Sequence, residues 1–546
     1  MVLGPSRGAS LPPPAMPAAA LRLLCGVVMP AAMLCAEPLP RIAFPSGDPR
    51  RTLTHFSQDN VSHYDILLLH GSEEELYVGA RDRVLALTVG TPGSIRAKAS
   101  ITWGPTAEKT SECAFKKKSQ ETECFNFIRV LVALNQTHLY VCGTYAFSPA
   151  CTYIHLENFT LMSSGRGQPF LDGKGQCPFD PQHTYTALLV GEYGASGPHG
   201  WAPIPGMEWR VTAGGGGPYR CSPPPRPRAD GELYAGTMNN FQGNEPIISR
   251  SLGSRTLLKT DAFLRWLSGE QGDGPWEDPP GPLTRPRARG CLQQPPPSFQ
   301  LLTHPPWLCP TADAAFVASF SIPGDDKVYF FFEETADEFD FFERLLVPRV
   351  ARVCKSDVGG DKVLQKKWTT FLKAQLMCSQ PGHFPFNVIH HAFALPRRDG
   401  GADFYAVFTS QQAGRAGSAA VCAYSLEALE EVFEGKYKEL NKESSRWTVY
   451  GGPDMSPRPG SVSAAHPGDT ALPGDDAGPR GEGFVCPSLP CVLALVVSEQ
   501  DGEGGGCQWC WHGAASWRIP QPPCYMGASS DKALTFMKDH FLMDGK

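Results

Sequence analysis

The chain has 546 residues, of which 49 are basic and 55 acidic, so its formal net charge is −6. A chain of this length exceeds one core of ordinary size, which leaves several domains or a single propeller or barrel. This near balance of charge supports neither the basic surface by which many proteins bind nucleic acid nor a polyacidic tail. We therefore expect no nucleic-acid partner.

The first 36 residues follow the order of a secretory signal peptide. Arg7 and Arg22 come first, an apolar stretch runs from Leu23 to Leu34, and the small residue Ala36 follows. The apolar stretch is about a dozen residues long, whereas a membrane span needs roughly 20. No later segment is as long and apolar as a span requires. The sequence predicts an exported chain whose mature part is 37–546.

Short strand-like phrases return along the mature chain. Each combines aromatic and β-branched residues in a short run, which is typical of β-strands. These phrases lie at 75–79, 138–143, 232–236, 327–331 and 404–408. Their recurrence predicts an all-β fold made of repeated units.

Three segments differ from their surroundings and are dense in Gly and Pro. They lie at about 191–229, 268–310 and 462–523. Such composition is unfavourable for a regular β-ladder, so we interpret the segments as low-complexity insertions. With the first two set aside, the tyrosines of the strand phrases recur roughly every 50 to 75 residues, a spacing typical of propeller blades.

The cysteine count predicts a disulfide-bonded framework. The chain holds 18 cysteines, and in an exported protein this number favours disulfides over metal binding. Setting aside Cys25 and Cys35 of the signal and those in the insertions leaves four pairs and one odd thiol among Cys113, Cys124, Cys142, Cys151, Cys177, Cys354, Cys378, Cys422 and Cys524. Sequons at Asn60, Asn135 and Asn158 predict N-glycosylation in the same compartment.

The motifs that could bind a metal or act in catalysis stand without the further residues that such a site needs. Cys507 and Cys510 have the spacing of a redox or half-zinc motif, but no second ligand pair accompanies them in matching context. His390 and His391 are adjacent, so on a strand they would point to opposite faces. The sequence contains no Gly-x-Ser-x-Gly or His-Glu-x-x-His signature. We expect no metal, no cofactor and no enzymatic activity.

Three further segments call for interpretation. The basic run Lys116 to Lys118 can bind sulfated glycans or lie in a solvated loop. The acidic residues between Glu333 and Glu343 alternate with phenylalanines, and they can form a partner surface or cover packed rings. Apolar residues between Lys362 and Cys378 recur near helical spacing, which predicts a helix laid on the propeller.

Five longer phrases resemble the sema domain of the semaphorin family. They are CGTYAFSPAC at 142–151, DGKGQCPFDP at 172–181, KVYFFF at 327–332, RVCKSDVGG at 352–360 and WTTFLK at 368–373. Two more, SECAFKKK at 111–118 and DKALTFMKDHFLMD at 531–544, are similar to class 4 semaphorins of subtype A. The resemblance extends from about Leu39 to the last residue.

The resemblance implies a seven-bladed β-propeller over 37–546, with the three Gly- and Pro-rich segments as insertions. Complete family members continue through their last blades, smaller modules and, in class 4, a membrane anchor. We therefore expect the propeller to be incomplete at its C-terminal end in this chain, which would leave an unpaired strand edge.

The resemblance also implies the disulfide pairs Cys113–Cys124, Cys142–Cys151, Cys354–Cys524 and Cys378–Cys422, and it leaves Cys177 without a partner. Each bridge is expected to stabilise the fold by about 2–4 kcal/mol. The bridge to Cys524 has to close across the third insertion, which raises its closure entropy.

As a semaphorin, the chain is expected to be an extracellular ligand that binds plexin receptors, of B-type or D-type, as a homodimer. The signal would act in cell guidance, cytoskeletal and migration control, angiogenesis and immune regulation. By resemblance, the plexin-facing edge includes Asn239, Asn240, Gln242, Lys538 and His540.

Two alternatives to a ligand are compatible with the fold. The same propeller occurs in receptors, namely plexins and receptor kinases, although the phrases at 142–151 and 172–181 fit the ligand better. A secreted propeller hydrolase such as a sialidase would need an arginine cluster with a Tyr/Glu pair, and no motif indicates one.

Overall fold

The structure is a computed structural model of the chain. It describes residues 54–70, 75–90, 94–162, 170–191, 194–196, 231–253, 255–261, 266–267, 314–336, 345–360, 364–379, 384–397, 400–411, 419–441, 446–453, 460, 485–490, 493–497 and 510–513.

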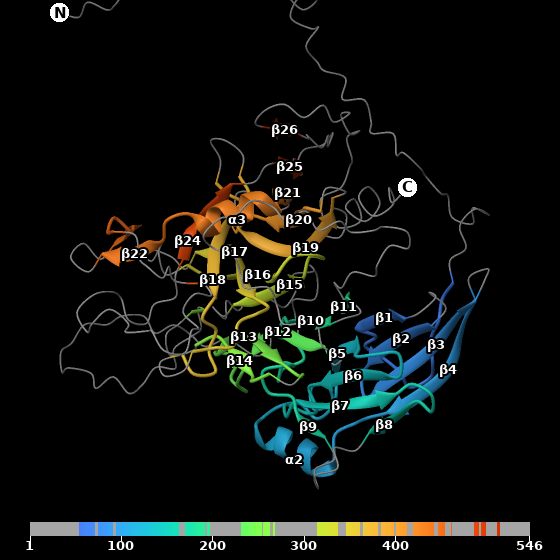
Figure 1. The fold of residues 1–546 in the computed structure, drawn as a ribbon. Helices are drawn as coiled ribbons and strands as arrows, with labels where there is room; N and C mark the ends of the chain where they lie inside the picture. Colours follow the sequence, from blue (N-terminus) through green and yellow to red (C-terminus); the bar gives the residue numbers. More distant parts are fainter. Residues whose placement is uncertain are drawn as a thin grey trace, which may run out of the picture. The chain divides into compact units, whose positions relative to one another are not determined.

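These residues form five β-sheets, which follow one another in chain order from β1 to β21 (Figure 1). Sheet I contains β1 (Ile66–His70), β2 (Glu75–Ala80), β3 (Arg83–Gly90) and β4 (Ser94–Thr102). Sheet II contains β5 (Ile128–Ala133), β6 (His138–Gly143), β7 (Ala150–His155), β8 (Thr160–Met162) and β9 (Leu171–Asp172). Sheet III contains β10 (Thr186–Gly191), β11 (Gly194–Ser196), β12 (Glu232–Met238), β13 (Pro246–Ser251) and β14 (Leu258–Lys259).

The last two sheets also take up strands from later in the chain. Sheet IV contains β15 (Ala315–Phe320), β16 (Lys327–Thr335), β17 (Leu346–Cys354) and β18 (Leu372–Met377), followed by β24 (Val485–Pro490), β22 (Lys438–Asn441) and β23 (Arg446–Val449). Sheet V contains β19 (Val388–Pro396), β20 (Ala402–Thr409), β21 (Ala419–Ser425), β25 (Leu493–Val497) and β26 (Cys510–Gly513). The described helices are α2 (Ala107–Phe115) and α3 (Leu426–Glu434).

Successive sheets pack against one another through their first strands. β1 lies beside β5, β5 beside β10, β10 beside β15, and β15 beside β19. Buried side chains fill each space between sheets, such as Trp103 and Ile128 between sheets I and II, and Phe320 and Phe404 between sheets IV and V. Antiparallel sheets packed in series about their inner strands are the architecture of a β-propeller.

The strand β16 shows how the sequence produces this packing. It lies between β15 and β17 and pairs antiparallel with both. Val328, Phe330 and Phe332 face the core shared with sheet III, whereas Tyr329 and Phe331 face the core shared with sheet V. Alternate side chains of a strand point to opposite faces, so a run without a polar residue is required where both faces are covered.

A buried arginine joins sheets III and IV. Arg250 of β13 is only 1% exposed, and its Nη1 donates to the backbone oxygen of Asp357 at 2.5 Å. Its guanidinium also lies 5.6 Å from the ring centroid of Trp368, whose Nε1 donates to the backbone oxygen of Ile248 at 2.9 Å. The cation is thus hydrogen-bonded and stacked, as a buried charge requires.

The carboxylate of Asp357 organises the turn between β17 and β18. It accepts hydrogen bonds from the backbone nitrogens of Gly359, Thr369 and Thr370, and from both threonine hydroxyls, at 2.7–2.9 Å. Asp357 is buried at 2% exposure, so little water competes with these donors for its carboxylate. The turn is therefore held rigidly by a single side chain.

The helix predicted between Lys362 and Cys378 is wrong. Within 364–379 the structure has a turn followed by the strand β18, which pairs antiparallel with β17. Leu372, Ala374 and Leu376 face the core between sheets IV and V with a period of two residues. A short apolar run satisfies helical and strand spacing alike, and the pairing with β17 decides between them.

The segment 462–523 contributes three strands, although its composition predicted no regular ladder. β24 pairs with β18 in parallel, β25 pairs with β21 antiparallel, and β26 pairs with β25. β-Ladders use backbone groups, so the edges of β18 and β21 can pair with a segment that is poor in strand-forming side chains.

Several predicted features lie outside the described residues: the signal peptide 1–36, Cys507, Cys524, Lys538 and His540. Among the residues that the structure describes, no helix has the length and apolar character needed to cross a membrane.

Replacing Asp357 by alanine (Asp357→Ala) is expected to lower the free energy of unfolding by about 3 kcal/mol, because several buried donors lose their acceptor. Urea denaturation followed by tryptophan fluorescence measures the change. The exposed Asp59 provides the control Asp59→Ala, which should leave the midpoint unchanged. Equal stability of the two variants would show that Asp357 does not organise this turn.

Candidate functional site

The loop that joins β12 to β13 is closed by its own side chains. Asn239 is buried; its Nδ2 donates to Oε1 of Glu245 at 2.6 Å, and its backbone nitrogen donates to the backbone oxygen of Glu245 at 2.8 Å. Oδ1 of Asn240 accepts from the backbone nitrogens of Gly243 and Asn244 at 3.0 and 3.2 Å. Gln242 is exposed at the tip. The loop therefore presents Gln242 from a rigid base.

An aromatic contact anchors this loop to sheet II. The rings of Phe241 and Phe147 meet edge to face with centroids 5.5 Å apart. Phe241 and Phe179 pack on a buried cluster that contains Phe147 and the disulfide between Cys113 and Cys124. The loop cannot shift without breaking this aromatic packing.

Residues 144–149, between β6 and β7, hold an unusual backbone turn. Tyr145, Ala146 and Phe147 have φ angles of 42°, 54° and 58°, all in the left-handed region. This conformation costs roughly 1–2 kcal/mol for each L-residue. The backbone nitrogen of Tyr145 donates to Oδ1 of Asn126 at 3.0 Å, and that of Ala146 donates to the backbone oxygen of Phe125 at 2.9 Å. Strain held by surrounding contacts is a feature of functional sites.

The basic run at 116–118 is divided among different roles. Nζ of Lys118 lies 3.1 Å from a carboxylate oxygen of Asp180 and 3.5 Å from one of Glu123, and it stands 4.5 Å from the ring centroid of Phe147. Nζ of Lys116 lies 5.0 Å from the ring centroid of Phe241. Lys118 is thus structural, and Lys116 and Lys117 remain exposed.

The helix α2 follows from its end residues. Thr106 caps its first turn, because Oγ1 accepts from the backbone nitrogen of Lys109 at 3.3 Å. Cys113 turns inward to its disulfide, whereas Phe115, the last helical residue, is 91% exposed. We call α2 and the loops 144–149, 173–183 and 239–245 the loop cluster.

Three disulfides among the described residues join the cysteines that the resemblance pairs: Cys113–Cys124, Cys142–Cys151 and Cys378–Cys422. The first ties α2 of the loop cluster to Cys124, the second joins β6 to β7 at the ends of the loop 144–149, and the third joins β21 to the residue that follows β18. Cys354 is also disulfide-bonded, but Cys524, its implied partner, lies outside the described residues. Cys177 is a buried free thiol, and burial raises its pKa well above the ordinary value.

The three sequons lie at turns. Asn60 is exposed and adopts a left-handed φ of 60°. Asn158 is exposed in the hairpin between β7 and β8, and its Oδ1 accepts from the hydroxyl of Thr160 at 2.8 Å. Asn135 is half-buried between β5 and β6, and its Oδ1 accepts from the hydroxyl of Thr137 at 2.9 Å.

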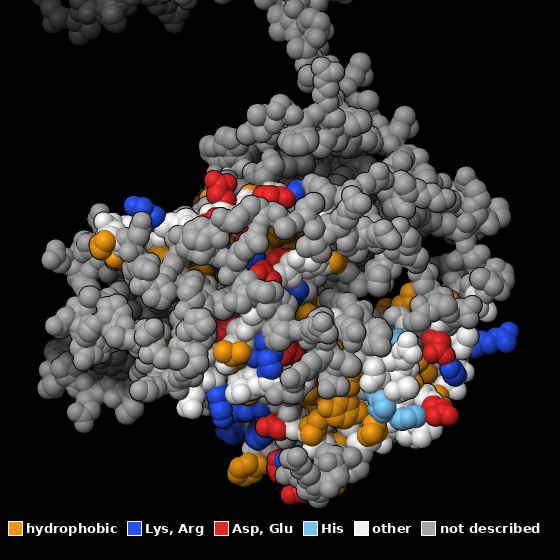
Figure 2. Space-filling view, in the orientation of Figure 1, with side chains coloured by type: hydrophobic (Ala, Val, Ile, Leu, Met, Phe, Trp, Pro, Cys, Tyr) orange, Lys and Arg blue, Asp and Glu red, His pale blue; other side chains and the backbone are white. Residues whose placement is uncertain are grey.

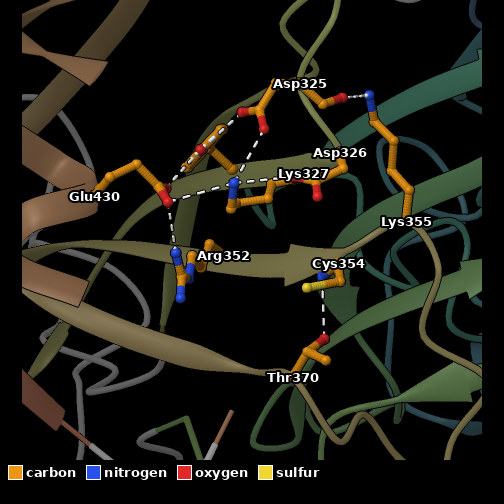
Figure 3. Close-up of polar contacts among 9 residues, drawn as sticks. Asp325, Asp326, Lys327, Arg352, Cys354, Lys355, Thr370 and Glu430 are labelled. Carbon is orange, nitrogen blue, oxygen red and sulfur yellow. Dashed lines mark hydrogen bonds and ion pairs between the residues drawn. The ribbon is translucent and has the colours of Figure 1, made fainter. Parts of the chain in front are cut away.

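A second polar cluster fastens α3 to sheet IV (Figure 3). The carboxylate of Glu430 accepts from the hydroxyl of Tyr329 at 2.8 Å and from Nη1 of Arg352 at 2.7 Å, and it lies 3.3 Å from Nζ of Lys327. The same lysine pairs with Asp325 and Asp326 at 3.2 and 2.9 Å. Each of these three carboxylates faces a cation, and Lys355 donates to the backbone oxygen of Asp325 at 2.6 Å, so the cluster is a structural joint.

The histidines and acidic residues do not come together as a metal site in the described part of the chain. His390 sits at a β-bulge of β19, and its Nε2 is 2.8 Å from Oγ1 of Thr409. Glu333 lies apart from cations: its Oε2 accepts from the backbone nitrogen of Ile389 at 3.2 Å, and burial raises its pKa to about 7. The neighbouring Glu334 instead pairs with Arg349 and Lys373.

Several known proteins are similar to this chain in sequence. The family model described as Sema domain matches residues 389–475. Human Semaphorin-4A is 45% identical over 509 residues, which cover 93% of this chain and 48% of that protein. The chain belongs to the class 4 semaphorins. It spans about half the length of the curated relatives it matches. The resemblance to class 4, subtype A, is confirmed.

Solved structures agree on the fold. The extracellular domains 1–2 of Drosophila Semaphorin 1a match with a TM-score of 0.54 at 23% identity, covering 86% of this semaphorin and 82% of that chain. A chain from the structure of Drosophila Plexin A in complex with Semaphorin 1b matches with a TM-score of 0.52 at 20% identity, covering 84% and 81%. The prediction of an all-β propeller of the sema type is confirmed.

Sequence reasoning found the phrases of the loop cluster but missed their contacts. Phe147, Phe179 and Phe241 come from separate phrases, and each stands in a segment that the resemblance singled out. Of the predicted partner residues, Asn239, Asn240 and Gln242 lie together in this semaphorin. Asn239 is committed to Glu245, which leaves Asn240 and Gln242 nearer the surface.

Glu333→Gln is expected to make this semaphorin more stable at pH 7.5, by about 1–3 kcal/mol. The folded carboxyl has a raised pKa of about 7 against an ordinary 4.5, so folding retains a proton that the unfolded chain releases. The native stability contributed by this group is therefore full below pH 4.5 and declines as pH rises to 7.

Urea denaturation of native and variant protein between pH 5 and 8 measures this effect. The difference between the two should be small at pH 5 and largest above pH 7. Glu334→Gln is the matched control on the same strand, and it should destabilise because Arg349 and Lys373 lose their buried counter-charge. If the difference in unfolding free energy between native protein and Glu333→Gln did not change with pH, this would contradict the raised pKa of Glu333.

Proposed function

We propose that this chain is the receptor-binding part of an extracellular semaphorin ligand, which signals by binding a plexin and catalyses no reaction. Membership of class 4 supports this proposal, and so does the likeness of the fold to a structure of a plexin with a semaphorin. The single most informative observation is the loop cluster, where a strained turn, a disulfide and an aromatic anchor fix an exposed loop. Fixed loops lose little entropy when they bind.

Within the loop, the residues divide by role. Gln242 is exposed and Asn240 half-buried, so these two are the proposed contact residues, while Asn239 supports the loop from below. Lys538 and His540 belong to the same proposal by family resemblance. A receptor of B-type or D-type and a homodimeric ligand are the finer parts of the proposal, with guidance, cytoskeletal and migration control, angiogenesis and immune regulation as outcomes.

The domain organisation is proposed on the same basis. Residues 1–36 serve as the signal peptide and 37–546 as the sema domain, with insertions at about 191–229, 268–310 and 462–523. In the complete family member, a membrane anchor would hold this domain at the cell surface. Similarity to curated class 4 ligands favours this assignment over a receptor's own sema domain.

Gln242→Arg is expected to weaken plexin binding by about tenfold, because a long charged side chain at the loop tip disrupts a packed interface. Surface plasmon resonance of the full chain with a panel of plexin ectodomains gives the ratio of the dissociation constants of the variant and the native chain. Gln136→Arg is the control: Gln136 is also exposed but lies in the turn between β5 and β6. Unchanged binding by Gln242→Arg would remove the loop from the contact.

We further propose that Asn60, Asn135 and Asn158 carry N-glycans. Protein secreted from mammalian cells should lose mass on treatment with peptide N-glycosidase F, and each Asn→Gln variant should lose one glycan by intact mass. A sequon that retains an unmodified asparagine in peptide mass spectra is not used.

A further inference from the structure

A second surface lies at the other end of sheet III from the loop 239–245. It is formed by the turn between β13 and β14 and by the turn that follows β17. Successive turns of an antiparallel sheet lie at opposite ends of its strands, which separates this surface from the loop cluster by the length of β13. Two of its side chains, Leu257 and Val358, are apolar and exposed, by 46% and 59%.

The same buried arginine holds the backbone beneath both exposed side chains. Arg250 donates through Nη1 to the backbone oxygen of Asp357 and through Nη2 to that of Thr256, at 2.5 and 3.3 Å. Val358 directly follows Asp357 in the chain, and Leu257 directly follows Thr256. Two positions 101 residues apart in sequence are therefore brought together by one guanidinium.

The backbone around these side chains has little freedom. Gly359 adopts a φ of 82°, and a Cβ there would lie 2.7 Å from Cδ2 of Leu258. The backbone nitrogen of Lys259 donates to the backbone oxygen of Lys366, and that of Trp368 donates to the backbone oxygen of Lys259, both at 3.2 Å. Such a surface is organised before any partner arrives, which lowers the entropy lost on binding.

The charge around the apolar pair is positive. Lys366 is exposed, Lys259 is half-buried, and among the described residues neither has a carboxylate partner, whereas Lys367 is paired with Asp261 at 3.1 Å. Figure 2 shows Lys and Arg side chains gathered over β14 and the loops beside it, next to hydrophobic atoms. Exposed apolar side chains beside unpaired cations fit a partner that offers apolar surface flanked by carboxylates.

We propose that Leu257, Val358 and Lys366 form a second contact for the plexin receptor, one that binds an apolar, acidic patch of it. This inference rests on the proposed function. β14 is the outer strand of sheet III and has two residues, so a receptor can approach that edge. The six residues of β13 span roughly 20 Å, and a standard interface is roughly 30 Å across, so one partner can reach both ends.

A sulfated glycan is the competing occupant, since it would also satisfy the lysines. It would leave Leu257 and Val358 without an apolar partner, so the exposed pair favours a protein. The two occupants respond differently to substitution: a glycan depends on the lysines, whereas a protein contact depends on the apolar pair and less on charge.

The test measures binding of the full chain to plexin ectodomains by surface plasmon resonance. The double variant Leu257→Ser with Val358→Ser should weaken binding about tenfold or more, and Lys366→Glu about threefold, with the latter effect reduced at high salt. Met162→Ser on β8 is the apolar control and Lys436→Glu the charge control, since both residues are exposed. Both controls should bind like the native chain, and thermal melting should confirm that all variants are folded.

The outcomes separate this inference from the proposed function. If the native chain binds no plexin, the proposed function fails. If Gln242→Arg weakens binding but the double serine variant does not, only the second contact is overturned. If Lys366→Glu abolishes retention on heparin while the double variant retains full plexin binding, the surface is a glycan site and the inference is likewise overturned.

Discussion

The joint between sheets III and IV depends on placing a guanidinium where no water reaches it. Arg250 is tolerated there because its donors meet backbone oxygens of two turns and its face meets Trp368. Once this cation is fixed, Asp357 and its five donors fix the turn after β17. The side chains on that turn are then displayed at defined positions, so a buried electrostatic requirement determines an exposed surface.

The loop cluster applies the same principle with sulfur and aromatic rings instead of charge. The disulfide Cys142–Cys151 pins the ends of β6 and β7, and between them the chain passes through three left-handed residues that put Phe147 inside. Phe241 packs edge to face on Phe147, and this contact fastens the loop 239–245 of sheet III to sheet II. Strain at one turn is offset by packing that orders its neighbour, which suits a surface that recognises another protein.

Neighbouring acids on β16 show how position decides what a carboxylate does. Glu334 turns to Arg349 and Lys373 and is a paired, buried charge, whereas Glu333 turns to the backbone nitrogen of Ile389 and has a raised pKa. Adjacent residues of a strand face opposite sides, so one sequence position separates a stabilising pair from a group sensitive to pH. At the far end of the same strand, Lys327 joins α3 through Glu430.

By itself, the sequence determined an exported, disulfide-bonded β fold through its local strand composition and cysteine count, and its contiguous phrases carried the family resemblance that implied the propeller and the cysteine pairs. Tertiary structure decided what those phrases touch. Phe241 meets Phe147, residues 372–377 pair as a strand where spacing predicted a helix, and Leu257 comes to lie near Val358. Each depends on contacts between residues far apart in the chain, such as the bond from Arg250 to Asp357 across 107 positions, and no local pattern encodes such a contact.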